Sequence, residues 1–117
     1  MNKIIFALVL LISLSACQTK SLYHWGDYSQ TAYKYVMEPS DKTRLKHQQS
    51  MLDIVVTANK KNIKVAPGIY AELGLLAMEN NKINQAIAYY QQEAENFPES
   101  QKLMEYLIKQ LKGLNDA

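Results

Sequence analysis

The only cysteine of the chain is the residue whose surroundings indicate a definite chemistry. Cys17 directly follows the small residues Ser15 and Ala16, which a signal peptidase accepts just before its cleavage site. Upstream, Lys3 supplies a positive charge, and residues 4–14 form an almost unbroken apolar run. This run is too short to cross a hydrocarbon core of roughly 30 Å comfortably as a helix. We therefore predict that residues 1–16 are an export signal.

The order Leu14-Ser15-Ala16-Cys17 resembles the lipobox of bacterial lipoprotein precursors. The resemblance implies cleavage after Ala16, diacylglycerol on the Cys17 sulfur and a further acyl chain on the new amino group. Two or more acyl chains anchor a protein stably in a membrane. Gln18 stands where enterobacterial lipoproteins retained in the inner membrane have aspartate, so similarity to them implies the periplasmic face of the outer membrane. The alternative is an uncleaved membrane anchor in which Cys17 is incidental.

Other residue types that carry chemistry are not arranged as a site. His24 and His47 lack the spacing of a metal-binding pair, and we expect His47 on an exposed helix face. Glu93 and Glu95 lie on a predicted helix with nothing to separate their pKa values for acid–base catalysis. The sequence predicts no enzyme, cofactor, metal or small-molecule substrate. A net charge of +2 without a clustered basic face also argues against nucleic-acid binding.

Helical spacing of apolar residues and no strand alternation predict an all-α fold. Ser40 or Asp41 is suited to cap a helix, and Pro39 ends the element before it. Asn80 and Asn81 indicate a turn, and Gly113 is suited to stop the last helix. The predicted helices are 30–37, 42–62, 69–79, 83–96 and 101–112.

The apolar residues of each predicted helix define the face expected to point inward. For the helix over 42–62 these are Leu45, Met51, Leu52, Val55, Val56, Ala58 and Ile63. For the last helix they are Leu103, Tyr106, Leu107 and Leu111.

Residues 67–100 have the 34-residue period of a tetratricopeptide repeat. Two positions depart from its pattern, because Ala77 replaces an aromatic residue and Glu93 replaces a small one. A generic helical hairpin is the alternative interpretation. The residues that match the repeat are Tyr70, Leu73, Gly74, Ala86, Tyr90 and Pro98.

One repeat cannot bury both of its faces. We therefore expect the helix over 42–62 and the last helix to flank it, which gives a short stack of about four helices. By similarity to tetratricopeptide repeats, Leu75 and Met78 point towards a concave surface. They are covered there by the helix over 42–62 or the Trp25 segment, or they form a groove for a partner's peptide or helix.

Aromatic residues gather in the segment that follows the tether, over 23–35. They must pack on the domain or on a partner. Tyr23, Trp25, Gly26 and Tyr28, then Tyr33, lie just downstream of the lipobox and upstream of the repeat-like hairpin. This arrangement resembles a family of small periplasmic lipoproteins known as domain of unknown function 4810. The resemblance implies an envelope complex with other lipoproteins, one of them similar to the curli secretion channel, and implies no chemistry.

The sequence therefore predicts three regions: a signal peptide over 1–16, a lipidated tether with the aromatic segment over 17–39, and a helical domain over 40–117. The predicted function is a lipid-anchored adaptor that binds other envelope proteins. A pilotin-like assembly factor for a secretion or pore complex is the alternative. The predicted site residues are Cys17 for lipidation and Trp25, Tyr28, Tyr33, Leu75 and Met78 for partner binding.

Overall fold

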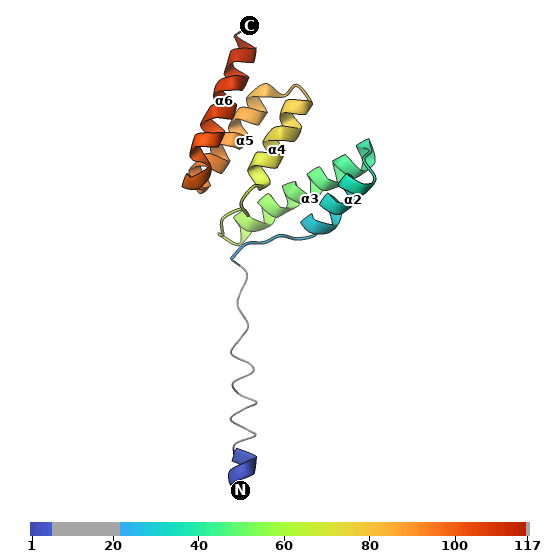
Figure 1. Cartoon of the computed structure of the whole chain (residues 1–117), viewed down its shortest axis with the longest axis vertical. Coiled ribbons are helices and arrows are strands. Elements are labelled where there is room, and N and C mark those ends of the chain that lie inside the picture. The colour runs from blue at the N-terminus through green and yellow to red at the C-terminus, as the bar shows by residue number, and fades with distance from the viewer. Residues whose placement is uncertain (6–21, 117) are drawn as a thin grey trace.

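A computed structural model describes residues 1–5 and 22–116 (Figure 1). Within these ranges no strand is present, so the predicted all-α fold is confirmed. The bounds of α4 and α5 agree with the prediction, and those of α3 differ by one or two residues. The helices are α2 (Tyr28–Met37), α3 (Asp41–Lys60), α4 (Ile69–Glu79), α5 (Ile83–Asn96), the 3₁₀ turn η2 (Pro98–Ser100) and α6 (Gln101–Asn115).

Local side-chain chemistry explains where the helices begin and end. Ser40 and Thr43 form a reciprocal capping box at the start of α3, in which each side chain accepts a hydrogen bond from the other residue's backbone N–H. Asn62 and Asn81 adopt left-handed backbone angles just after α3 and α4. Asparagine tolerates this conformation better than most residues, so both positions suit the turns they occupy.

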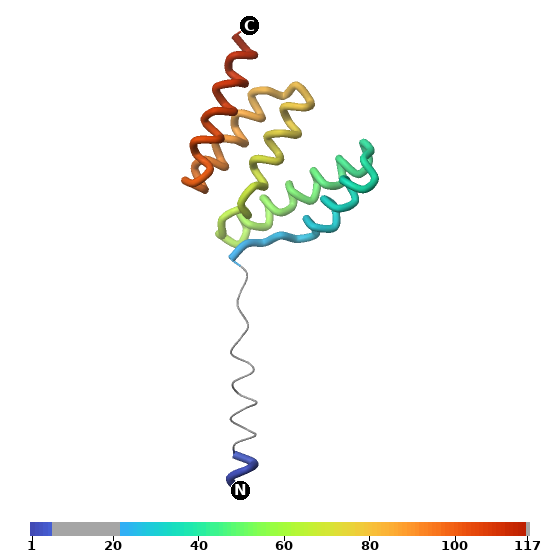
Figure 2. Tube along the Cα trace, in the orientation of Figure 1, coloured from blue at the N-terminus to red at the C-terminus, as the bar shows by residue number. Residues whose placement is uncertain are grey.

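The helices form two groups that meet at the turn between α3 and α4. Helix α2 lies along α3, while α4, α5 and α6 lie side by side (Figures 1 and 2). The two groups diverge from the α3–α4 turn, and the segment from residue 22 to α2 runs along α3 close to this turn. Helix α4 therefore contacts both α5, in its own group, and α3, in the other.

The core consists of two apolar clusters, and α4 contributes to each. One face of α4 buries Ile69 and Leu73 against α3, and another buries Ala77 against α5 and α6. Full burial of a large aliphatic side chain stabilises a fold by about 1.5–3 kcal/mol. The first cluster contains Met51, Ile54, Ala58, Val65, Ala66, Ile69, Tyr70, Leu73 and Leu76, and the second contains Ala77, Ala86, Tyr90, Met104 and Leu111.

Two residues of the repeat pattern explain how α4 and α5 approach each other. A Cβ added to Gly74 would lie only 2.5 Å from a ring carbon of Tyr90, so the glycine leaves the space that the ring fills. Glu93 is buried, and its Oε1 accepts a hydrogen bond from the Gly68 N–H at the start of α4, over 2.8 Å. The glutamate that departs from the repeat pattern therefore holds the α3–α4 connection on α5. The tetratricopeptide assignment itself stays a prediction.

The inward faces of α3 and α6 were predicted incorrectly in part. On α3, Leu45 and Val56 are exposed, whereas the buried stripe is His47, Ser50, Met51, Ile54 and Ala58. The stripe follows the side on which α2 and α4 pack, and this side includes polar residues. On α6, Leu103 and Tyr106 are exposed, while Met104 and Leu111 are buried against α5.

The prediction that Gly113 stops the last helix is wrong. Helix α6 continues to Asn115. The Asn115 side chain donates a hydrogen bond to Asn84 Oδ1 on α5, over 3.2 Å, and the Asp116 N–H donates to the Lys112 carbonyl. These bonds support a last turn that the glycine alone would not favour.

Candidate functional site

The predicted lipidation site, Cys17, lies outside the described residues. The description resumes at Leu22, five residues further along the chain. The candidate site is therefore built from the aromatic segment that begins there and from the helices on which the segment packs.

Residues 23–28 attach the segment that begins at residue 22 to the helical stack. Tyr23 packs on the first apolar cluster, and its ring meets Phe97 edge-on at 6.2 Å. Gly26 has a φ of +49°, a left-handed angle that side chains disfavour. This bend precedes Asp27, whose Oδ1 accepts a 2.5 Å hydrogen bond from the Ser50 hydroxyl on α3. The segment thus packs on the stack itself, one of the two arrangements left open by the sequence.

A network of polar side chains joins α2, α3 and α4. The Tyr28 hydroxyl donates a 2.5 Å hydrogen bond to Glu72 Oε2. The other carboxylate oxygen, Oε1, lies 3.4 Å from His47 Nε2, and His47 Nδ1 lies 2.8 Å from the Thr31 hydroxyl. One side chain from each helix thus contacts the next, with His47 of α3 at the centre.

The partners in this network decide the protonation state of Tyr28. The roles of the two His47 ring nitrogens as donor or acceptor depend on the tautomer of the ring. Burial raises the pKa of Tyr28 to about 12, with further contributions from its hydrogen bond to Glu72 and from the charge of that carboxylate. At neutral pH the phenol is therefore protonated and remains a donor.

The order Thr31–His47–Glu72 is similar to a nucleophile, a base and an orienting acid. A nucleophile must reach its substrate, but Thr31 and His47 are both buried. The Thr31 hydroxyl also lies within hydrogen-bond distance of the Tyr28 and Asp27 carbonyl oxygens. These contacts suit a group that joins helices. The prediction that the chain is not an enzyme stays a prediction.

The placement of His47 corrects the sequence interpretation. We expected it on an exposed helix face, but only 3% of its surface is exposed, because α2 covers that face of α3. The rings of Tyr28 and Tyr35 contact it at 5.1 and 6.2 Å. The spacing of His47 from Met51, Ile54 and Ala58 is that of one helix face and would have indicated its burial.

The predicted partner-binding residues differ in exposure. Tyr33 on α2 is 65% exposed, Leu75 on α4 is 44% exposed, and Trp25 is 40% exposed. The Trp25 ring packs on Tyr28 at 5.5 Å, and Tyr28 contacts α4 one turn before Leu75. Met78 is partly buried against the cluster shared with α5 and α6. The structure therefore brings Trp25 and Tyr28 together, whereas Met78 packs into a different cluster.

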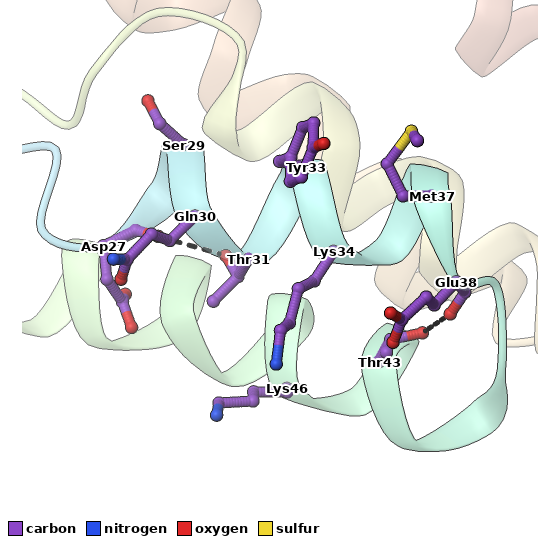
Figure 3. A pocket seen from close by; sticks show the side chains of 10 residues that line it. All are labelled: Asp27, Ser29, Gln30, Thr31, Tyr33, Lys34, Met37, Glu38, Thr43 and Lys46. Carbon is purple, nitrogen blue, oxygen red and sulfur yellow. Dashed lines mark hydrogen bonds between the residues drawn. The ribbon is translucent and has the colours of Figure 1, made fainter.

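Tyr33 lines a shallow cavity of about 670 Å³ between α2 and α3. The Lys34 and Lys46 side chains lie on one side of α2 and those of Tyr33 and Met37 on the other (Figure 3). Thr43 closes the far end by donating a 2.8 Å hydrogen bond to the Glu38 carbonyl. Sequence reasoning missed this cavity because it depends on how α2 lies on α3.

A comparison with protein families shows which family this chain belongs to. The model described as a domain of unknown function, DUF4810, matches residues 22–107, which is most of the chain. The chain belongs to the DUF4810 family. The match begins at the aromatic segment and ends within α6, so the DUF4810 region includes both helical groups and the polar network between them.

A second match covers the region upstream of the DUF4810 domain. Residues 1–18 match a prokaryotic membrane lipoprotein lipid attachment site. The chain is therefore a membrane-anchored lipoprotein, and Cys17 lies within the matched residues. No helix in the described part of the chain is long and apolar enough to cross a membrane. No curated protein and no solved structure matches the chain.

Proposed function

We propose that this lipoprotein is an adaptor that binds other envelope proteins from the periplasmic face of the outer membrane. The observation that carries the proposal is a set of large apolar side chains exposed at both ends of the stack. Helix α2 exposes Tyr33, Val36 and Met37, and α6 exposes Leu103, Tyr106 and Leu114. Terminal helices of stacked repeat proteins normally have polar outer faces, which keep the protein soluble.

The exposed apolar side chains of α6 lie on one side of the helix. Leu103, Tyr106 and Leu114 are three to eleven residues apart, at spacings that return to one side of a helix. Met104 and Leu111 on the adjacent side pack on α5. The apolar surface of α6 therefore extends beyond the stripe that packs on α5. Exposed apolar side chains that gather on one side of a helix often mark a protein interaction site.

The membrane anchor supplies the rest of the mechanism. Acyl chains on Cys17 confine the helical stack to the surface where other lipoproteins are tethered, which raises its effective concentration for them. Gln18 after the cysteine supports the outer membrane, and the family resemblance supports a partner similar to the curli secretion channel. Binding would bring such partners together without any covalent chemistry.

Charge substitutions at exposed apolar positions test this proposal in cells. Tyr33→Glu on α2 and Tyr106→Glu on α6 place a carboxylate where a partner would need apolar contact. Because both positions are exposed, the fold should tolerate the changes. Gln49→Glu, at an exposed position on α3, is the matched control.

The measurement is mass spectrometry of proteins cross-linked to each acylated variant in intact cells. We expect capture of a partner lipoprotein by the parent chain and by Gln49→Glu, and its loss in at least one of the other variants. Capture unchanged in both would overturn the adaptor role at these surfaces. If the partner complex needs this protein only while the complex is being assembled, the pilotin-like alternative is favoured.

A further inference from the structure

The turn between α3 and α4 carries an exposed group of lysines close to the segment that begins at residue 22. Lys60 ends α3, and Lys61 and Lys64 follow within the turn. All three are exposed. In Figures 1 and 2 this turn lies beside the segment that begins at residue 22.

Ring contacts show that Lys64, in the same turn, and Tyr23, at the start of the segment, are neighbours. Lys64 Nζ lies 5.7 Å from the centre of the Phe97 ring and 3.1 Å from the Asn96 carbonyl oxygen. Tyr23 contacts the same ring at 6.2 Å. Leu22, the residue before Tyr23, is 80% exposed. An exposed apolar side chain and a basic turn therefore share one end of the molecule.

The length of the covalent connection places this end at the membrane. Leu22 is five positions after Cys17, so even a fully extended chain spans at most about 18 Å between them. Each polar headgroup layer of a bilayer is several Å thick, roughly 5–8 Å, and the acylated cysteine is held at its inner boundary. The α3–α4 turn is therefore kept within a short distance of the lipid headgroups whatever path the tether takes.

Acidic residues near this end are set back from the turn. Glu99 belongs to η2, between α5 and α6, and Figure 1 places that connection farther from residue 22 than the α3–α4 turn. Glu93 is buried and accepts a hydrogen bond from the Gly68 N–H. Lys60 and Lys61 are exposed and form no salt bridge within the described residues, so the turn keeps their positive charge.

We propose that the α3–α4 turn is a membrane-docking surface. Lys60 and Lys61 bind the phosphate groups of anionic phospholipids, and the Leu22 side chain enters the interface beside them. Lys64 supports the surface by holding the turn on Asn96 and Phe97. Docking fixes the orientation of the stack, so that the α4–α5 turn and the end of α6 point away from the bilayer (Figure 1). The proposal requires the lipid anchor but no protein partner, so it stands or falls separately from the adaptor role.

Amine acetylation of the native acylated protein tests the docking surface. The protein is reconstituted in vesicles that contain phosphatidylglycerol and, for comparison, in vesicles of phosphatidylcholine alone. A lysine near an anionic surface gains an interaction equivalent to about a fivefold change in equilibrium constant. We therefore expect Lys60 and Lys61 to be acetylated on the order of fivefold more slowly on the anionic vesicles, with the difference lost at high salt. Lys42 and Lys109 serve as internal controls and should react equally on both.

Single neutralising variants separate docking from local shielding. In Lys60→Gln the protection of Lys61 should fall, and in Lys61→Gln that of Lys60 should fall. Lys42→Gln should change neither. Equal reactivity of Lys60 and Lys61 on the two vesicle types would overturn the proposal, as would protection that survives high salt. Protection in cells but not on anionic vesicles would also overturn it, because a protein would then be what covers the turn.

Discussion

Helices α4, α5 and α6 meet through apolar side chains, as α3 and α4 do, whereas α2 is joined to α3 and α4 largely by polar ones. Between α4 and α5, Ala77, Ala86 and Tyr90 pack in one cluster, and Gly74 admits the Tyr90 ring. At the α2 side, Tyr28 and Thr31 contact Glu72 and His47 beside an apolar cluster. Apolar burial tolerates small adjustments, while a buried polar group requires its partner. We infer that the α2 side is the more easily released of the two.

The largest expected effect concerns α4, which both groups share. Leu73→Ala removes a buried side chain from the first cluster and should lower the free energy of unfolding by about 2–5 kcal/mol. Leu75→Ala, two residues further along at an exposed position, should change it by less than about 0.5 kcal/mol. Urea unfolding followed by circular dichroism measures both. Equal effects would show that α4 does not bury the face described here.

A smaller effect is expected when the polar junction loses its central ring. His47→Ala removes one partner each from the Glu72 carboxylate and the Thr31 hydroxyl, together with a buried ring that contacts Tyr28, at a cost of about 1–3 kcal/mol in the free energy of unfolding. The single tryptophan, Trp25, reports on the α2 side, so its fluorescence should change at a lower urea concentration than the helical signal does. Gln49→Ala, at an exposed position on α3, is the control. If the two signals change together, the halves do not separate.

Because α4 and α5 approach closely at Gly74, adding a single methyl group there should lower the free energy of unfolding modestly. Gly74→Ala adds a Cβ that would lie 2.5 Å from Tyr90, so the ring must move. Overpacking of this kind costs about 1–3 kcal/mol, and alanine recovers about 1 kcal/mol through its higher helix propensity. We expect a net loss of about 1 kcal/mol in thermal unfolding. Gly113→Ala, where a Cβ meets open space, should be neutral or stabilising.

The smallest effect is a pH dependence caused by Tyr28. Its pKa rises from an ordinary value of 10.0 to about 12 in the folded protein, which favours the neutral phenol there. The stabilisation is therefore complete below pH 10 and is lost as the pH rises through 12. The free energy of unfolding should decline less steeply over this range in Tyr28→Phe than in the parent chain. Identical slopes would contradict the raised pKa of Tyr28, to which burial contributes most and the hydrogen bond to Glu72 less.

The α4–α5 hairpin could be predicted from the sequence because its signals are local. Apolar residues at spacings of three and four gave both helices, and Asn80–Asn81 gave the turn. The polar junction could not be predicted in the same way, since His47 pairs with Thr31 and Glu72, which lie 16 and 25 residues away. The spacing of His47 could have indicated that it lies on the buried face of its helix, whereas the side chains that contact it are set by tertiary packing.

The aromatic segment shows how a family motif can be visible while its role is not. Tyr23, Trp25, Gly26 and Tyr28 are distinctive in the sequence, which predicted Trp25 and Tyr28 as partner contacts and left open whether the aromatics pack on the domain or on a partner. In the structure Tyr23 packs on the core, and Tyr28 donates to Glu72. Trp25 keeps an exposed part, so a contact there stays a prediction. The motif also attaches the chain that leads to the membrane anchor to the helical stack.

Hydrogen–deuterium exchange of the native acylated protein tests most directly whether the polar contacts with His47 and Glu72 hold α2 on the stack. We predict that the amides of α2 are protected, though less than those of α4 and α5. In Glu72→Gln, which keeps the shape of the side chain but weakens its hydrogen bonds, protection should fall in α2 and remain in α5 and α6. Amides of α2 that exchange at unprotected rates in the parent chain would contradict the account.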